Sequence, residues 1–248
     1  MVKYIFVFVM MIGFVSIANA QTLTGEEILK KIDDNMVIDQ AISTTTMIIH
    51  GRAGTRTITS KGWTHGRDKS FVEYLSPPRE KGKKMLRLDD NLWNYVPEPT
   101  DRIITISGHL LKQSVMGSDL SYEDVTENRK LYEMYNAKIV GSEKIDDRDC
   151  YVLELTAKES DITYYSRKIW VDKNRWLPLQ EERFAKSGKL LKKTEIKDVF
   201  LVDGRWYPKE MTFKDMLLTG EGTEYIIDSI NFNVNIPDYQ FTKAALRK

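Results

Sequence analysis

The chain has 248 residues, and its 37 lysines and arginines nearly balance its 36 aspartates and glutamates. This balance argues against a nucleic-acid-binding protein, which usually carries a strong basic excess. With 42% hydrophobic and 29% charged residues, the composition is typical of a folded domain and not of a disordered chain. A single cysteine, Cys150, excludes an internal disulfide.

Residues 1–20 have the pattern of a secretory signal peptide. Lys3 gives a short positive start, residues 4–17 are almost wholly apolar, and an A-N-A cleavage sequence precedes Gln21. The apolar run is shorter than the roughly 20 residues of a membrane-spanning helix. Cleavage before Gln21 is therefore favoured over an uncleaved anchor helix. We expect a soluble exported protein with one domain over residues 21–248.

A helix is predicted directly after the leader. Thr24 and Glu27 have the spacing of a capping box. Apolar residues then recur at helical spacing from Ile28 to Met36. Such a helix either covers a pocket as a lid or completes a dry core, and the periodicity alone favours the dry core.

Most of the remaining chain has the two-residue period of β-strands. About a dozen short segments rich in Thr, Val, Ile, Tyr and Trp are separated by Gly, Pro, Asp or Asn. Their connections are too short for crossover helices, so antiparallel hairpins are predicted. A short helix or loop is expected over residues 107–116, and a helix from residue 121 onward. An Asp-Gly pair before Arg205 predicts a tight turn.

The alternation of polar and apolar residues predicts how this sheet is covered. Over residues 167–172, polar and apolar side chains alternate in a way that is typical of a sheet with one wet face. A sheet of so many strands must curl. A curled sheet with an apolar concave face and a helix over it forms a pocket. The predicted fold class is therefore mainly β, of the α+β kind, with a curved antiparallel sheet.

The sequence lacks the common catalytic motifs. It contains no G-x-S-x-G, H-E-x-x-H, P-loop or G-x-G-x-x-G sequence. Cys150 lies in a predicted strand, where a packed side chain is favoured over a nucleophile. The spacing of His50, His65 and His109 does not bring them to one carboxylate. We therefore predict no catalytic residues, no metal site and no cofactor, and a protein that is not an enzyme.

A basic stretch, "SPPREKGKKMLR", covers residues 76–87 and carries five basic residues against one glutamate. It is predicted to form a solvated turn and an edge strand, in which lysines hinder sheet-to-sheet aggregation. Docking to an acidic partner or to anionic lipid headgroups is the alternative.

Large apolar side chains on neighbouring predicted strands, and in the segment after them, are candidates for the wall of a pocket. Such flexible or bulky side chains suit a site that accepts chains of variable shape, although each of them is equally suited to a plain core. We hypothesise that nine residues line or gate a ligand-binding cavity: Trp63, Phe71, Leu86, Leu88, Trp93, Tyr95, Leu110, Leu111 and Met116.

The stretch "SVMGSDLSYEDV", residues 114–125, is dense in polar side chains and admits three interpretations. A calcium loop would need a central glycine and a distal glutamate in a spacing that is absent here. A catalytic carboxylate pair would need one buried acid with a raised pKa. A mechanical role is favoured, because the stretch contains a glycine for a sharp turn, Ser121 and Asp124 at the spacing of a capping box with aspartate in place of glutamate, and acids for a first helical turn. The predicted structural motif comprises Gly117, Ser118, Asp119, Tyr122, Glu123 and Asp124.

The same stretch carries a family resemblance. Together with "PPREKGKKMLRLDDNLWNYVPEPTDRIITI", the sequence "MGSDLSYEDV" resembles the LolA-like outer-membrane lipoprotein-sorting proteins. The resemblance is closest to a branch with an MGSD-x-SYED motif, and it is most specific over residues 77–125. It implies an incomplete β-barrel with helices that cover an apolar cavity.

The resemblance also implies a function. It predicts a soluble carrier in the periplasm that binds acyl chains of lipoproteins or other lipids and delivers them toward the outer membrane. An RND-type transporter of the inner membrane and an outer-membrane acceptor are the implied partners, and a monomer is expected. Two alternatives stay open: an envelope-assembly module that binds protein without lipid, and a secreted enzyme with an unrecognised site.

Overall fold

The computed structural model describes residues 23–52, 54–232 and 234–248. The predicted signal peptide and its cleavage site lie outside these residues.

One antiparallel sheet of thirteen strands dominates the described part of the chain. Two meanders, β1 to β6 and β7 to β13, are joined side by side through the pairing of β1 with β13. The strands, in chain order, are β1 (Gln40–Gly51), β2 (Gly54–His65), β3 (Lys69–Ser76), β4 (Lys84–Leu88), β5 (Asn91–Val96), β6 (Arg102–Ile106), β7 (Tyr135–Ile145), β8 (Arg148–Ala157), β9 (Ser166–Asp172), β10 (Pro178–Phe184), β11 (Leu190–Val202), β12 (Arg205–Asp215) and β13 (Gly222–Asn231).

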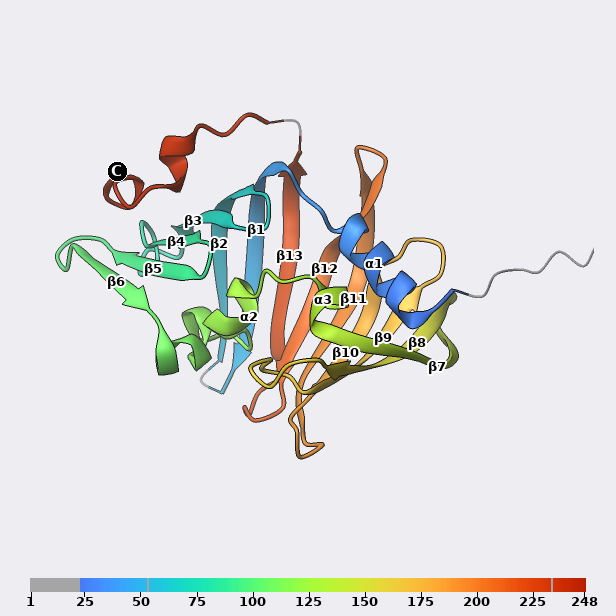
Figure 1. Cartoon of the computed structure of the whole chain (residues 1–248). Coiled ribbons are helices and arrows are strands. Elements are labelled where there is room, and N and C mark those ends of the chain that lie inside the picture. Colours follow the sequence, from blue (N-terminus) through green and yellow to red (C-terminus); the bar gives the residue numbers. More distant parts are fainter. Residues whose placement is uncertain (1–22, 53, 233) are drawn as a thin grey trace, which may run out of the picture.

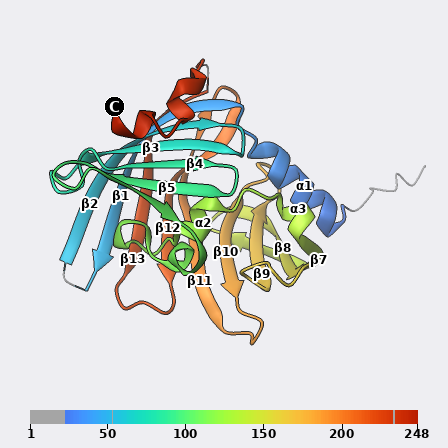
Figure 2. The ribbon, with the colours of Figure 1, turned by 60° about the vertical axis from the view of Figure 1, so that its left-hand side comes forward.

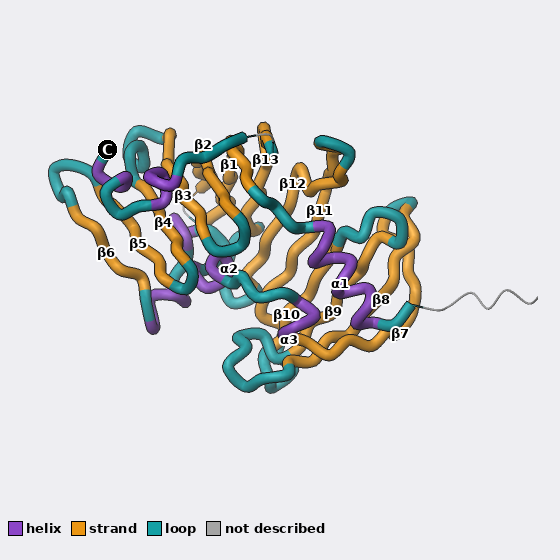
Figure 3. The backbone as a smooth tube through the Cα atoms, turned by 45° about the horizontal axis from the view of Figure 1, so that its top comes forward, coloured by secondary structure: helices purple, strands orange, loops and turns teal. Residues whose placement is uncertain are grey.

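Residues 25–35 and 108–134, which contain most of the helices, lie across one face of this sheet, and the sheet curves without closing, so that β6 and β7 form its two free edges (Figures 1 and 3). The mainly β fold with an incomplete barrel is confirmed. We call the face that these two segments cover the inner face, and the opposite one, which the C-terminal helices cover, the outer face. The helices are α1 (Gly25–Asn35), α2 (Tyr122–Thr126), α3 (Leu131–Met134), and the short 3-10 helices η1 (Gly108–Lys112), η2 (Val115–Gly117), η3 (Asp238–Phe241) and η4 (Ala245–Arg247).

Helix α1 begins as its sequence predicts. The Thr24 hydroxyl accepts from the backbone of Glu27 while the Glu27 carboxylate accepts from the backbone of Thr24, which completes the capping box. Ile28 and Leu29 are fully buried against the inner face of β7 to β9. The dry-core interpretation is therefore confirmed for this helix. The predicted Asp-Gly turn also forms, with positive φ at both Asp203 and Gly204.

Two expectations about exposure are wrong. Strand β9 has no fully wet face, since Arg167 and Asp172 are both buried and Lys168 is only partly exposed. The basic stretch does not end in an edge strand, because β4 lies between β3 and β5. Lys84 and Arg87 are buried there. A charged residue in the sequence is thus a poor sign of exposure in a strand that other segments cover on both faces.

The C-terminal segment, residues 234–248, covers the outer face of the first meander (Figure 2). Its Phe241 and Leu246 are 4% and 0% exposed and pack on Phe71, Leu86 and other side chains of β2 to β5. The backbone of Ile236 donates to the Gln40 side chain at 2.6 Å. This cluster is filled by the chain's own side chains.

Candidate functional site

The motif segment crosses the inner face between the two meanders, and a tight backbone loop shapes it. Val115 and Leu120 are joined by a backbone hydrogen bond of 2.8 Å. Between them, Met116 and Gly117 both have positive φ, 52° and 75°. The Met116 carbonyl accepts from the Arg56 guanidinium of β2 at 2.8 Å. A side chain at Gly117 would place its Cβ 2.8 Å from that guanidinium, so this position favours glycine for two reasons.

Asp119 links this loop to both strands of the β12–β13 hairpin. Its carboxylate accepts from the Asp215 backbone at 2.9 Å and from the Thr223 hydroxyl at 2.8 Å. The Thr223 hydroxyl accepts in turn from the Asp119 backbone at 3.0 Å. Asp119 and Thr223 are 8% and 1% exposed. The predicted mechanical role of Asp119 therefore takes the form of a buried clamp on a distant hairpin.

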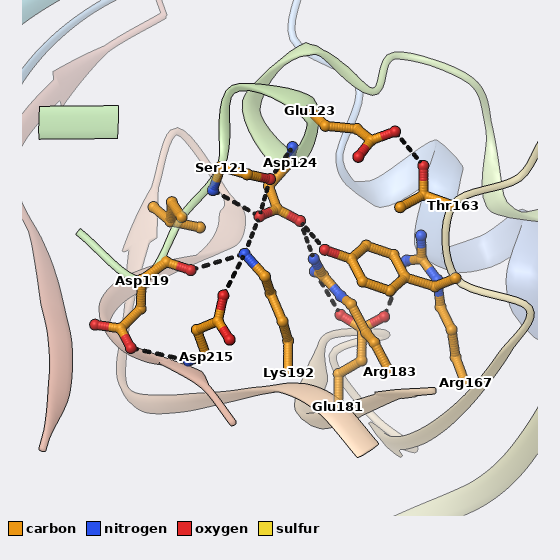
Figure 4. Close-up of polar contacts among 12 residues, drawn as sticks. Asp119, Ser121, Glu123, Asp124, Thr163, Arg167, Glu181, Arg183, Lys192 and Asp215 are labelled. Atoms are coloured by element: carbon orange, nitrogen blue, oxygen red, sulfur yellow. Dashed lines mark hydrogen bonds and ion pairs between the residues drawn. The ribbon is translucent and has the colours of Figure 1, made fainter. Parts of the chain in front are cut away.

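Asp124 caps α2 and anchors it to the sheet (Figure 4). Its carboxylate accepts from the backbone and hydroxyl of Ser121, the predicted capping box with aspartate in place of glutamate. It also accepts from Tyr164 at 2.6 Å, Lys192 at 2.6 Å and Arg183 at 3.1 Å. Burial alone would raise the pKa of Asp124, but the charges of Arg183 and Lys192 outweigh it and lower the pKa to about 2. A carboxyl with so low a pKa is ionised at neutral pH and does not serve as a general acid.

A second buried pair extends the cluster along the inner face. Glu181 accepts from Arg167 at 2.9 Å and from Arg183 at 2.8 Å. Burial opposes the charged form of Glu181, but Arg183 and Arg167 hold its pKa below the ordinary range. Arg167 also donates to the Tyr135 hydroxyl at 2.8 Å, which itself donates to the Tyr164 carbonyl. The arginines and carboxylates of this centre thus pair with one another, although the buried Arg183 Nε has no partner among the described residues.

The other motif residues have local partners. Tyr122 lies against Asn94 of β5, with its hydroxyl 2.6 Å from the amide nitrogen. Glu123 accepts from the Thr163 hydroxyl at 2.5 Å. Ser118 is fully buried, and its hydroxyl accepts from the backbone of Leu120. The predicted motif thus fastens the crossing segment to both meanders.

In the described part of the chain, three hollows border this segment, and the two larger ones have room for a ligand. The inner cleft, of about 440 Å³, lies between α1, α2, α3 and strands β9 and β10. Half of its lining residues are charged, among them Asp33, Arg87 and Arg167. The edge groove, of about 450 Å³, lies between strands β4 to β6 and the segment η1 to α2. Its wall is largely apolar, and Ile104, Ile106 and Leu110 contribute to it.

The structure divides the nine predicted ligand-binding residues between the two faces of the sheet. Leu110, Leu111 and Met116 lie on the inner face, where they pack around Leu92 and Tyr122. The other six belong to the outer-face cluster beneath the C-terminal segment, or pack against it: Trp63, Phe71, Leu86, Leu88, Trp93 and Tyr95. Leu110, Met116 and Tyr95 also border the edge groove. The nine therefore do not line one cavity, and their contact with a ligand stays a prediction.

Sequence reasoning missed the charged centre that holds α2. Arg167, Glu181 and Arg183 come from strands that follow the motif by about 40 to 60 residues. The sequence did contain one indication of this centre. Arg167 lies two and four residues before Ile169 and Val171, so it shares their face of the strand, where an apolar residue would be expected. Among the described residues, no group of three or more His, Cys, Asp or Glu side chains is placed to hold a metal ion.

Comparison with known proteins finds similar proteins over most of the chain. Residues 66–248 match a family model described as "Uncharacterized protein". A DUF1329 family protein from Desulfovibrio piger is 27% identical, with a TM-score of 0.80 over 90% of this chain and 98% of that one. No match to a curated protein was found.

Two further solved structures share the fold. An outer membrane lipoprotein-sorting protein domain from Vibrio parahaemolyticus is similar at 24% identity and a TM-score of 0.80, over 90% of this chain and 98% of that one. A LolA superfamily protein from Nitrosomonas europaea is similar at 24% identity and a TM-score of 0.73, over 90% of this chain and 100% of that one. In the described part of the chain, no helix has the length and apolar character to cross a membrane.

Proposed function

Since the chain belongs to the family whose model spans residues 66–248, and its resemblance to LolA-like proteins is confirmed, we propose that it is a carrier of lipid acyl chains. In this proposal it binds a chain of a lipoprotein or of another lipid in the periplasm and passes it toward the outer membrane. It performs no catalysis. An inner-membrane RND-type transporter and an outer-membrane acceptor are the proposed partners.

The observation that carries this proposal is the edge groove. It lies on the inner face of an unclosed LolA-like sheet, and its volume of about 450 Å³ falls within the range of small-molecule sites. Ile104, Ile106, Leu110 and Met116 supply apolar contacts along it. Each methylene that such walls remove from water contributes about 0.8 kcal/mol, so about five methylenes correspond to millimolar binding and about ten to micromolar binding.

The charged centre explains why the groove and not the whole concave face is the proposed site. Helix α1 fills the inner face over β7 to β9, and the ion pairs around Asp124 occupy the middle. An acyl chain placed there would separate buried charges from their partners, which is costly. The apolar hollow proposed for the acyl chain is therefore the groove along strands β4 to β6.

The test is uptake of a fluorescent fatty acid, followed by native mass spectrometry for lipid that co-purifies. Ile104 is 44% exposed on edge strand β6 and borders the groove. Ile104→Asn combined with Leu110→Asn is expected to weaken uptake at least tenfold. Val140→Asn is the matched control, because Val140 is 42% exposed on the other edge strand, β7. Equal uptake by both variants, or no uptake by the unaltered protein, would count against the carrier.

A protein-binding envelope-assembly module is the second candidate. The observation that favours it is that the chain's own C-terminal segment fills the outer-face cluster. Six of the nine residues predicted to bind a ligand therefore contact this segment and not a cavity. In that case the purified protein would contain no lipid and take up none, while it would retain a stable protein partner in affinity purification.

A further inference from the structure

The turn between β12 and β13 presents an apolar tip to solvent. Met216, Leu217 and Leu218 are 42%, 57% and 46% exposed. Ten large hydrophobic side chains are exposed in the described residues, and these are the only three that are consecutive. Isolated exposed hydrophobic residues are ordinary, whereas a contiguous group marks an interaction site.

The tip is held outward by hydrogen bonds. The Met216 backbone donates to the Leu191 carbonyl of β11 at 2.8 Å. The Leu217 backbone donates to the Asp215 carboxylate at 2.9 Å, and Lys214 donates to the Leu218 carbonyl at 2.8 Å. Hydrogen bonds to neighbouring residues thus hold the backbone of all three residues in a conformation that leaves their side chains exposed.

The motif residue Asp119 fixes the base of the same turn. Its carboxylate joins the backbone of Asp215, the last residue of β12, to the hydroxyl of Thr223 at the start of β13. Gly220 closes the turn against the end of β1, where a Cβ would lie 2.6 Å from the His50 carbonyl. The tip is therefore a fixed projection with a buried support.

Two neighbouring turns at this end of the sheet carry basic side chains. The turns β1–β2, β10–β11 and β12–β13 end at the same lower edge in Figures 1 and 2. The first two supply Arg52, Lys186 and Lys189, all exposed. Within the three turns, residues 51–54, 185–189 and 216–221, Glu221 is the single acid. These three turns together thus carry more basic than acidic side chains.

We propose that this end of the sheet docks on an anionic lipid bilayer, with Met216, Leu217 and Leu218 inserted among the headgroups and Arg52, Lys186 and Lys189 against the lipid phosphates. An apolar tip within a basic rim is the combination that binds anionic membrane surfaces. Three side chains are too few for a stable interface with a second copy, which needs about 1,000 Å² or more. The inference goes beyond the proposed carrier function and does not require it, since a protein-binding module would dock in the same way.

The experiment is co-sedimentation of the purified chain, processed at its predicted leader, with vesicles of phosphatidylethanolamine and phosphatidylglycerol. Vesicles of phosphatidylcholine alone serve as the neutral surface. The tip variant is Leu217→Asn with Leu218→Asn. Its matched control is Leu201→Asn, because Leu201 is 58% exposed and lies beside the β11–β12 turn at the opposite end of the sheet. Lys186→Gln with Lys189→Gln tests the rim, and Lys138→Gln with Lys144→Gln, both exposed on β7, is its control.

The tip variant is expected to lose about tenfold or more in vesicle affinity, while Leu201→Asn stays within twofold. The rim variant is expected to weaken binding to the anionic vesicles several-fold and to leave the residual binding to neutral vesicles unchanged. No binding of the unaltered chain to anionic vesicles would overturn the proposal. So would equal losses in the Leu201 control, or a light-scattering mass that falls from dimer to monomer in the tip variant, which would assign the tip to a second copy.

Discussion

Replacement of Asp124 tests the charged centre most directly. The Asp124 side chain is 2% exposed and forms ion pairs with Lys192 and Arg183. Its pKa falls from an ordinary 3.8 to about 2, which at about 1.4 kcal/mol for each pKa unit corresponds to about 2.5 kcal/mol of folding free energy. Asp124→Asn removes the charge and keeps the shape. We expect it to lower the free energy of unfolding by about 2 to 3 kcal/mol at pH 7.

The direction of the pKa shift determines how the stability difference between protein and variant changes with pH. Because the folded-state pKa is depressed, the stabilisation is fully present above pH 3.8 and is lost as the pH falls toward 2. The stability gap between the unaltered protein and the variant is therefore expected to be constant between pH 5 and 7 and to narrow below about pH 4. Urea unfolding followed by tryptophan fluorescence measures it.

Glu123→Gln is the control for this experiment. Glu123 is the adjacent acid in the same first turn, but its carboxylate has only the Thr163 hydroxyl as a side-chain partner. We expect it to cost less than about 1 kcal/mol. The reasoning is refuted if the two variants cost the same, or if the gap for Asp124→Asn is as large at pH 3 as at pH 7.

Three further outcomes follow from the structure. Gly117→Ala is expected to cost about 2 kcal/mol by urea unfolding, more than Gly66→Ala, because both glycines have positive φ but only the first would press a Cβ against Arg56. Leu246→Ala is expected to cost about 3 kcal/mol and to raise binding of an apolar dye, since the side chain is fully buried in the outer-face cluster. Burial raises the pKa of Cys150 to about 11, so the native thiol should resist Ellman's reagent at pH 8 and react once urea unfolds the chain.

Local features of this fold could be predicted from the sequence because their determinants lie within a few residues. Both capping boxes, Thr24 with Glu27 and Ser121 with Asp124, form as their spacing predicts. The strands follow the two-residue period, and the sheet is antiparallel because the connections are short.

The segments that pack on each face of the sheet could not be predicted in the same way. Whether Trp93 or Leu86 faces a cavity depends on the segment that packs above it, and residues 234–248 lie more than 100 positions away in the chain. The partners of Asp119 are likewise 96 and 104 residues distant. Alternation distinguishes two faces of a strand, but it does not tell which face another part of the chain will cover.

The pairing of β1 with β13 has a consequence for the rate at which this protein folds. Each meander is built from neighbouring hairpins, whose contacts are close in sequence and form quickly. The seam between them joins Ile49 to Thr223, and the Asp119 clamp closes on the same threonine. We expect the joining of the two halves over so long a chain separation to be the slow, entropically costly step. A mutation in the β1–β13 seam is then expected to retard folding more than it accelerates unfolding.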